Sequence, residues 1–261
     1  MERNLAARAA MTVAALSASG LQKAFGSLAV ARNIEFALPQ AARYALVGPN
    51  GAGKTTLINL LTGMIRPDGG KIFLGGEEIT ALRPEQRVKR GLVRTFQINT
   101  LFPHLSALEA VTLAVCERRG QSGDWRRRLT GHRDAIDEAY DLLNSLMLGE
   151  HCYRLTRELA YGQQRLLEIA LALATRPRVL LLDEPAAGVP QDESAQLFSA
   201  IAGLAQDISV LFIEHDMNLV FRFASRIIVM VGGGILVEGT PAEIAANARV
   251  REVYLGKRSH G

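Results

Sequence analysis

The chain has 261 residues, of which 48% are hydrophobic and 21% are charged, so it can bury the core of one large α/β domain with a smaller appended lobe. A formal net charge of +4 permits an acidic partner or a membrane surface but requires neither, and a solvated surface of mixed charge is the simplest interpretation. No apolar stretch reaches the roughly 18 residues that span a bilayer, and the two cysteines, Cys116 and Cys152, form no CxxC pair and no metal-ligand spacing.

The N-terminal part begins with an extension and continues with strands. Residues 1–10 contain Arg3 and Arg8 but no apolar run follows them, so we expect a loose extension and no signal peptide, with Met11 as an alternative start. Without an export signal or a membrane span, a chain with two reduced thiols is expected in the cytosol. Extended patterns predict strands at 16–25, 30–38 and 44–47, and a hairpin of 71–74 with 77–80.

The rest of the chain passes from a helical pattern to alternating strands and helices. The apolar spacing predicts helices at 106–116 and 132–148. We interpret residues 101–173 as a helical lobe inserted into an α/β core. Such alternation implies a parallel sheet with helices packed on it, and we expect residues 11–250 to form one domain. Strands are predicted in its second half at 179–182, 209–213 and 226–231.

A glycine-rich loop follows the predicted strand 44–47, opens a predicted helix at 55–64 and matches the pattern GxxxxGK[ST] in full. Its glycines let successive backbone N–H groups turn toward one point, and the helix N-terminus adds partial positive charge. The alternative is a glycine-rich turn without a function, but the strand before this loop and the helix after it argue against that interpretation. The sequence therefore predicts a phosphate-binding loop whose lysine reaches the terminal phosphates and whose threonine can ligate Mg²⁺: Gly48, Pro49, Asn50, Gly51, Ala52, Gly53, Lys54 and Thr55.

Two later strands deliver polar side chains to one edge of the predicted sheet. Asp183 ends an apolar strand and is placed to hold Mg²⁺, and Glu184 is placed to orient or deprotonate the attacking water. Alone, the two carboxylates could equally cap the next helix, but the phosphate loop favours catalysis. His215 follows the strand 209–213 and could contact the γ-phosphate, although a lone histidine is more often structural.

A second helix start has a glycine turn. Gly162 precedes a helix predicted at 164–174. The free backbone donors of a helix N-terminus would make a second phosphate-binding surface, and the alternative is a plain helix start.

These elements, in this order, resemble the ATP-binding cassette ATPases of ABC transporters over nearly the whole chain. The resemblance implies a P-loop NTPase core with an N-terminal antiparallel β subdomain and an inserted helical subdomain. Within the family, the chain is most similar to the ATP-binding subunits of branched-chain amino acid importers. The residues that carry this similarity are Gly48–Thr56, Arg94–Gln97, Leu101–Pro103, Tyr161–Arg165, Asp183–Gly188, Glu214–Met217, Glu238–Pro241 and Val253–Gly256.

The resemblance also implies partners and roles. Two ATP-binding subunits, identical or different, face each other head to tail, and each ATP with its Mg²⁺ lies between one phosphate loop and the other subunit's signature. Transmembrane permease subunits hold such a subunit at the cytoplasmic face of the inner membrane, with a solute-binding protein on the other side and no nucleic acid involved. Gln97 would contact Mg²⁺ and sense the permease, whose coupling helix would dock on the helical lobe.

The site residues that follow from motif and resemblance fall into three groups. The catalytic residues are Lys54, Gln97, Glu184 and His215, and the metal ligands are Thr55, Gln97 and Asp183. Phe25 would stack on adenine and Val30 would line the base pocket, although a Phe at a strand end is more often core. The other nucleotide contacts are the phosphate loop with Thr56, and the signature residues Ala160, Tyr161, Gly162 and Gln163.

Two positions depart from the family pattern. Ala160 stands where the signature has a serine, whose hydrogen bond to a charged phosphate is worth roughly 1.5–3 kcal/mol and whose hydroxyl is the better helix N-cap by about 1 kcal/mol. Pro190 stands where the loop after Glu184 ends in Asp or Asn, and it has neither a polar side chain nor an N–H. We therefore expect two unequal ATP sites, with the weaker one using Ala160, and we expect their coupling to be affected.

Other functions stay open at this point. An exporter ATPase of the lipopolysaccharide type is the nearest alternative. A non-transport ABC protein acting on translation or on DNA would need a second cassette or a long coiled coil. A degenerate cassette would lack Glu184 or His215. The transported solute is not encoded in this chain, and the run Arg126–Arg128 is expected to be a solvated turn, with anionic lipid as the alternative.

Overall fold

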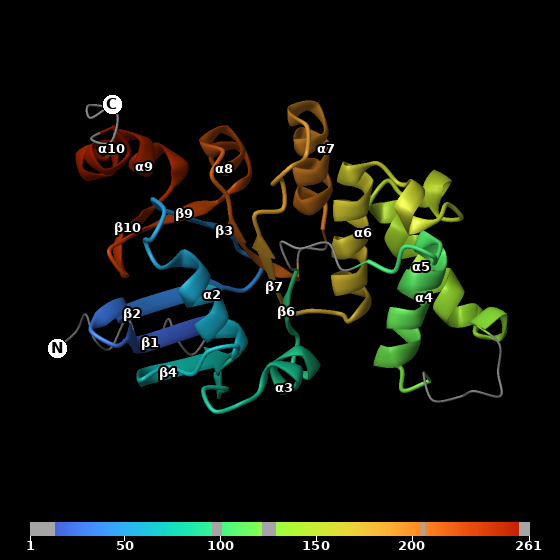
Figure 1. Ribbon diagram of the computed structural model, residues 1–261, viewed down its shortest axis with the longest axis horizontal. Coiled ribbons are helices and arrows are strands. Elements are labelled where there is room, and N and C mark those ends of the chain that lie inside the picture. The colour runs from blue at the N-terminus through green and yellow to red at the C-terminus, as the bar shows by residue number, and fades with distance from the viewer. Residues whose placement is uncertain (1–13, 96–100, 122–128, 205–206, 256–261) are drawn as a thin grey trace. The chain divides into compact units, whose positions relative to one another are not determined.

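The computed structural model describes residues 14–95, 101–121, 129–204 and 207–255 (Figure 1). The chain forms two compact units. The core unit comprises Met1–Leu92, Arg178–Glu184 and Gln206–Gly261, and the helical unit comprises Val93–Pro177 and Pro185–Ala205. Within the described ranges, no helix has the length and apolar character needed to cross a membrane.

The core unit starts with an antiparallel sheet in the strand order β2-β1-β4-β5. Phe25 pairs with Leu28 beside the first hairpin turn, and Leu16 pairs with Leu74 on the other side of β1. The predicted strands and the second hairpin are confirmed, although its last strand is shorter than expected. The strands are β1 (Ala14–Phe25), β2 (Leu28–Pro39), β4 (Gly69–Leu74) and β5 (Glu77–Glu78).

The second sheet has the strand order β10-β9-β3-β8-β7-β6. Strand β3 is parallel to both β8 and β9, and β7 is parallel to β8, which confirms the predicted parallel sheet. The short β6 and the antiparallel β10 were not expected from the sequence. The strands are β3 (Arg43–Val47), β6 (Leu92–Arg94), β7 (Val179–Asp183), β8 (Ser209–Ile213), β9 (Arg226–Val231) and β10 (Gly234–Gly239).

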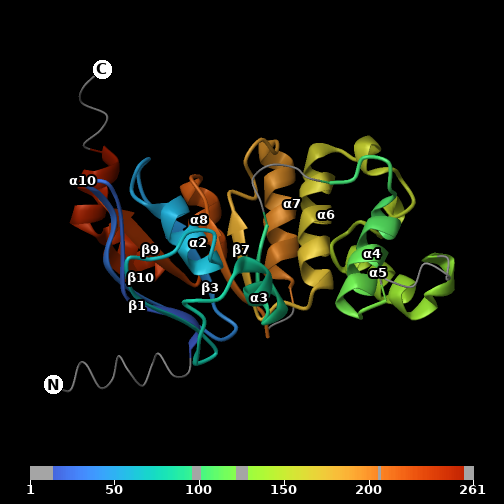
Figure 2. The same ribbon diagram turned by 60° about the horizontal axis from the view of Figure 1, so that its bottom comes forward.

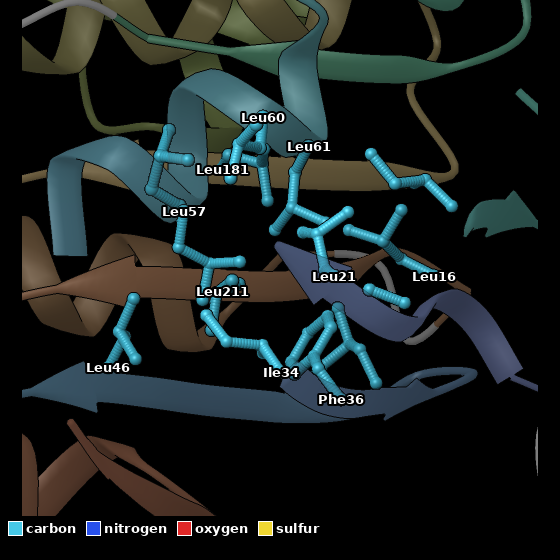
Figure 3. Close-up of a cluster of buried hydrophobic side chains, with 14 of the residues drawn as sticks. Leu16, Leu21, Ile34, Phe36, Leu46, Leu57, Leu60, Leu61, Leu181 and Leu211 are labelled. Atoms are coloured by element: carbon cyan, nitrogen blue, oxygen red, sulfur yellow. The ribbon is translucent and has the colours of Figure 1, made fainter. Parts of the chain in front are cut away.

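The core lies around the helix that follows β3. Figure 3 shows Leu57 and Leu61 of this helix, α2 (Lys54–Thr62), among leucines of both sheets, including Leu21 and Leu211. These side chains are fully buried, and each such burial stabilises the fold by about 1.5–3 kcal/mol. The other helices of the core unit are α3 (Pro84–Lys89), α8 (Met217–Phe223), α9 (Pro241–Ala246) and α10 (Ala248–Leu255).

A buried arginine fixes the end of α2. Arg87 is 1% exposed, and its guanidinium donates to the carbonyls of Leu60 at 2.9 Å and Leu61 at 2.6 Å. Burial lowers the pKa of Arg87 to about 10. The cation thus satisfies carbonyls in the last turn of α2, where the helix dipole favours positive charge.

In its described residues, the helical unit contains four α-helices and short 3₁₀ turns. In Figures 1 and 2, α6 and α7 run side by side. The predicted helix 132–148 ends at Ser145, before Met147 adopts a positive φ of 61°, and the predicted helix 164–174 begins earlier, at Tyr161. The elements are α4 (Ala107–Arg118), α5 (Arg133–Ser145), α6 (Tyr161–Ala174), α7 (Gln191–Ala202), η1 (Leu129–Gly131), η2 (Gly149–His151) and η3 (Thr156–Glu158).

Candidate active site

The phosphate-binding loop runs from the end of β3 to the start of α2. Gly53 is the N-cap of α2 in a left-handed conformation, with φ of 101°. The Lys54 side chain is buried, and its ammonium donates to the carbonyl oxygens of Gly48 at 2.7 Å and Pro49 at 3.2 Å. The loop backbone therefore bends around the one side chain that the motif assigns to the terminal phosphates.

Two loop glycines are required by close backbone packing. A Cβ atom on Gly53 would lie 2.6 Å from the carbonyl oxygen of Val30, and a Cβ atom on Gly48 would collide with the carbonyl oxygen of Met230. Real Cβ atoms do not approach backbone oxygens so closely, so any other residue here would displace the loop. The phosphate-binding loop therefore packs against both β2 and β9.

A hairpin turn also contacts the phosphate-binding loop, and the sequence alone did not indicate this contact. Gly233, between β9 and β10, donates its N–H to the carbonyl of Ala52 at 3.0 Å and accepts from the N–H of Arg32 at 2.7 Å. Gly232 and Gly233 have φ of 55° and 83°, as the central residues of a tight hairpin require. The paired glycines were a turn signal, but nothing local indicated that the turn meets the phosphate loop.

Substituting Gly233→Ala should weaken ATP binding and destabilise the core unit, because its Cβ would lie 2.9 Å from the backbone of Val30. Gly232→Ala is the matched control, since it has a similar positive φ but no atom lies within 4 Å of the place its new methyl group would take. Both variants have a backbone strain of about 1–2 kcal/mol. A difference between them in ATP affinity or unfolding temperature therefore reports the contact between position 233 and Val30. Equal ATP affinity and equal unfolding temperatures for the two variants would contradict this support role.

The two predicted polar strand ends lie next to each other. Asp183 is paired in register with Ile213, because β7 and β8 are parallel neighbours. The Glu184 N–H then donates to the Ile213 carbonyl at 3.1 Å, and its carboxylate Oε1 lies 2.9 Å from Nε2 of His215. The structure thus joins the side chains of Glu184 and His215.

Glu184 has an unusual backbone. Its φ is 50°, a left-handed conformation that is uncommon for a residue other than Gly, Asn or Asp. Such strain costs on the order of 1–3 kcal/mol and tends to persist at functional sites. This conformation turns the chain sharply at the carboxylate that sequence analysis assigned to catalysis.

The loop lysine and the two carboxylates also interact electrostatically. Burial lowers the pKa of the Lys54 ammonium, while the nearby charges of Glu184 and Asp183 act to raise it. Asp183 is 6% exposed at the end of β7. A buried cation whose charge is favoured by two carboxylates can bind a polyphosphate together with a divalent cation.

The predicted magnesium ligands offer oxygen atoms, as Mg²⁺ requires. Thr55 follows Lys54 at the exposed start of α2, and Asp183 lies close enough to affect the lysine. The part of the chain that the structure describes contains no group of three or more His, Cys, Asp or Glu that could hold a metal. An ion at this site would therefore take its remaining ligands from phosphate oxygens and water, which suits Mg²⁺. Gln97, the third predicted ligand, lies outside the described residues.

The predicted base-stacking residue is accessible. Phe25 is 51% exposed at the end of β1, and the Lys23 ammonium lies 5.6 Å from its ring centroid. Val30 on β2 is half-buried, and its carbonyl is the oxygen that contacts Gly53. An exposed aromatic ring on the strand pair that supports the loop is compatible with adenine stacking.

The signature turn opens α6 in the helical unit. Ala160 is the N-cap, and its N–H donates to the side-chain oxygen of Gln163 at 3.1 Å. This is half of a capping box, because alanine has no oxygen to accept the N–H of Gln163 in return. Tyr161 and Gly162 form the first turn of the helix with their backbone at the positive end of its dipole.

Pro190 closes the loop that follows Glu184 and is the N-cap of α7. Its carbonyl accepts the N–H of Ser194 at 2.9 Å and the hydroxyl of the same residue at 3.0 Å. The α7 start is therefore held through the backbone carbonyl, without the side-chain oxygen that the family places here.

Comparisons with known proteins place the chain in a family. The family model described as "ABC transporter" matches residues 31–187, and the model "Branched-chain amino acid ATP-binding cassette transporter" matches residues 235–260. The chain is 40% identical over 251 residues to the high-affinity branched-chain amino acid transport ATP-binding protein BraF of Pseudomonas aeruginosa, covering 93% of this chain and 98% of that one. It is 38% identical over 252 residues to the corresponding protein LivG of Escherichia coli K12, with the same coverage.

The fold has a close structural match as well. A crystal structure of the ADP conformation of an ATP-binding cassette of an ABC transporter has a TM-score of 0.82 and 28% sequence identity, covering 93% of this chain and 99% of that one. The predicted fold class, the predicted ATPase and the resemblance to the branched-chain amino acid group are thereby confirmed. The chain belongs to the ATP-binding cassette family of ABC transporters.

Proposed function

We propose that this chain is the ATP-hydrolysing subunit of a membrane importer for branched-chain amino acids or a related small polar solute, such as urea, an amide or an aromatic acid. The observation that carries the proposal is the pair of Glu184 and His215 at the carboxyl ends of β7 and β8, beside the buried lysine of a phosphate-binding loop. The relatives BraF and LivG are named as branched-chain amino acid transport ATP-binding proteins, which favours an amino acid transporter over an exporter of the lipopolysaccharide type.

In this proposal Glu184 accepts the proton of the attacking water, and His215 holds that carboxylate in place through the contact at 2.9 Å. The Lys54 ammonium exchanges its carbonyl partners for oxygens of the terminal phosphates. Mg²⁺, when bound, neutralises charge on the phosphates, and we assign it to Thr55, Asp183 and Gln97. Thr56 and the loop glycines contribute further phosphate contacts.

We also propose the assembly that the resemblance implies. A second ATP-binding subunit would complete the nucleotide site with its signature, while this chain lends residues 160–163 in return. Phe25 and Val30 would hold the base. Permease subunits would anchor the complex at the cytoplasmic face of the membrane, with residues 11–250 as the ATP-binding domain and residues 101–173 as its inserted lobe.

Ala160→Ser should tighten ATP binding at the site that this chain completes in its partner. The new hydroxyl supplies one hydrogen bond to phosphate and the missing half of the capping box, and roughly 1.5–3 kcal/mol corresponds to about ten- to hundred-fold tighter binding. ATP affinity is measured in the assembled complex, and the isolated subunit is the control, since its own phosphate loop does not include Ala160. Unchanged affinity in the complex would contradict the idea of two unequal sites.

The function is tested by co-purifying the chain with its transmembrane subunits in lipid vesicles and measuring ATP hydrolysis. We expect turnover that rises several-fold when a binding protein loaded with Leu, Ile or Val is added. The same measurement is made in parallel with binding proteins loaded with urea, an amide or an aromatic acid. Stimulation by none of these solutes, in a complex that hydrolyses ATP, would reject the importer assignment, and a complex without ATPase activity would reject the enzyme.

A further inference from the structure

The tyrosine of the signature turn is held rigidly by its own helix. The Tyr161 hydroxyl accepts from Nη2 of Arg165 at 2.8 Å, and the guanidinium carbon lies 5.1 Å from the ring centroid. Arg165 is 4% exposed and is itself paired with Glu168 at 2.8 Å. A buried ion pair therefore fixes one orientation of a tyrosine that remains 39% exposed.

This fixed ring packs against the loop that follows Glu184. Gly188 has φ of 77°, and a Cβ atom built on it would lie 3.2 Å from Cε1 and 3.3 Å from the hydroxyl oxygen of Tyr161. The loop is a tight turn closed by the Val189 N–H, which donates to the Ala186 carbonyl at 3.0 Å. The aromatic ring thus lies against this turn at Gly188, which has no side chain to hold it away.

A second contact joins the same two segments. A Cβ atom on Gly162 would collide with a carboxylate oxygen of Glu193 and lie 3.4 Å from the Glu193 Cβ. Glu193 belongs to α7, which Pro190 begins. The signature turn therefore contacts the segment after Glu184 twice, once through the loop at Gly188 and once through the first turn of α7.

We infer that Tyr161 is a positioning residue that joins the signature turn to the catalytic carboxylate of its own chain. The inference rests on the proposed function. The signature turn contacts the nucleotide held by the partner, and Gly188 lies in the short segment that continues from Glu184, so a movement of the turn displaces the chain next to that carboxylate. Pro190 has no polar side chain at the end of this loop, and the ring of Tyr161 contacts the loop two residues earlier, at Gly188.

The test uses membrane complexes in which only this chain retains its catalytic carboxylate, the other ATP-binding subunit having the corresponding amide. In that arrangement, Tyr161 faces the site that cannot hydrolyse ATP. We expect Tyr161→Ala to lower kcat at the active site about five-fold at saturating ATP, with the KM for ATP changed less than about two-fold. Tyr140→Ala, which removes an exposed tyrosine of α5, is the matched control and should leave both parameters unchanged.

A second pair of variants tests the contact itself. Gly188→Ala places a methyl group against the ring, whereas Gly120→Ala has a similar φ of 69° with no atom within 4 Å of the new methyl group. Gly188→Ala should lower kcat as Tyr161→Ala does, Gly120→Ala should not, and the double variant Tyr161→Ala with Gly188→Ala should be no slower than Tyr161→Ala alone.

The outcomes separate the inference from the function on which it rests. If the wild-type arrangement hydrolyses ATP and Tyr161→Ala has the wild-type kcat, or if the two substitutions at Tyr161 and Gly188 are additive, the positioning role is wrong and the ATPase stands. If the wild-type arrangement does not hydrolyse ATP, the proposed function fails and the inference fails with it.

Discussion

Replacing Glu184 by glutamine should abolish ATP turnover in the assembled complex while leaving ATP bound. The amide cannot accept a proton from water, and loss of a general base costs about 10²–10⁴-fold in rate. The amide keeps the shape of the side chain and can still accept a hydrogen bond from His215, which lies 2.9 Å from the carboxylate. Removing one negative charge beside the phosphate loop should also favour the bound nucleotide.

The measurement is steady-state phosphate release together with equilibrium binding of ATP. Glu85→Gln is the matched control, because Glu85 is an exposed glutamate of the same unit, in the first turn of α3, and its substitution should change neither quantity. Turnover within about three-fold of wild type in Glu184→Gln would remove this residue from catalysis, since a general base accounts for at least about 100-fold. Loss of ATP binding would instead mean that the carboxylate supports the fold of the loop.

The phosphate loop and the buried parallel strands were predictable because their signals are local. A glycine-rich loop between an apolar strand and a helix has few alternative structures, and short apolar runs ending in carboxylates indicate buried parallel strands. The placement of Glu184 next to His215 also followed from topology, because the carboxyl ends of adjacent parallel strands meet at one edge of a sheet.

The supports of the site were not predictable, because they depend on contacts between segments far apart in the chain. Gly233 lies in the hairpin turn between β9 and β10, and it contacts Ala52 and Val30, which are far from it in the sequence. The left-handed backbone of Glu184 opposes the usual preference of glutamate and is imposed by its surroundings. The tertiary contacts that fix these details have no counterpart in a local sequence pattern.

The same reasoning applies to an electrostatic cluster in the helical unit around Glu138. Glu138 on α5 accepts from Arg118 in a bidentate pair at 2.8 and 2.7 Å, from Arg119 at 2.6 Å and from Arg176 at 2.9 Å. The arginines come from the end of α4 and from the segment after α6, and Arg118 also donates to the Ala174 carbonyl at 3.0 Å. One carboxylate therefore joins three helices. No sequence pattern near Glu138 predicts this cluster of ion pairs.

Glu138→Gln should destabilise the helical unit by about 2–3 kcal/mol at neutral pH. The Arg118 pair, with Arg119 and Arg176, holds the pKa of Glu138 at about 2, against an ordinary value of 4.5, and a difference of that size corresponds to about 3 kcal/mol. Solvent screening reduces this stabilisation, because the Glu138 side chain is 17% exposed. The variant also leaves three guanidinium groups without their shared anion, which is the costly way to break a partly buried pair.

The pH dependence distinguishes this electrostatic effect from a packing defect. Because the folded-state pKa is lowered, the stabilisation is fully present above the unfolded-state value of 4.5 and is lost as the pH falls toward about 2. Urea unfolding should therefore show a constant difference between wild type and variant from about pH 8 to pH 5, and a shrinking difference below that range. Glu150→Gln, at an exposed glutamate in η2 of the same unit, should show no difference at any pH. A gap between wild type and Glu138→Gln that persists undiminished in acid would assign the loss to side-chain packing and not to the charge of Glu138.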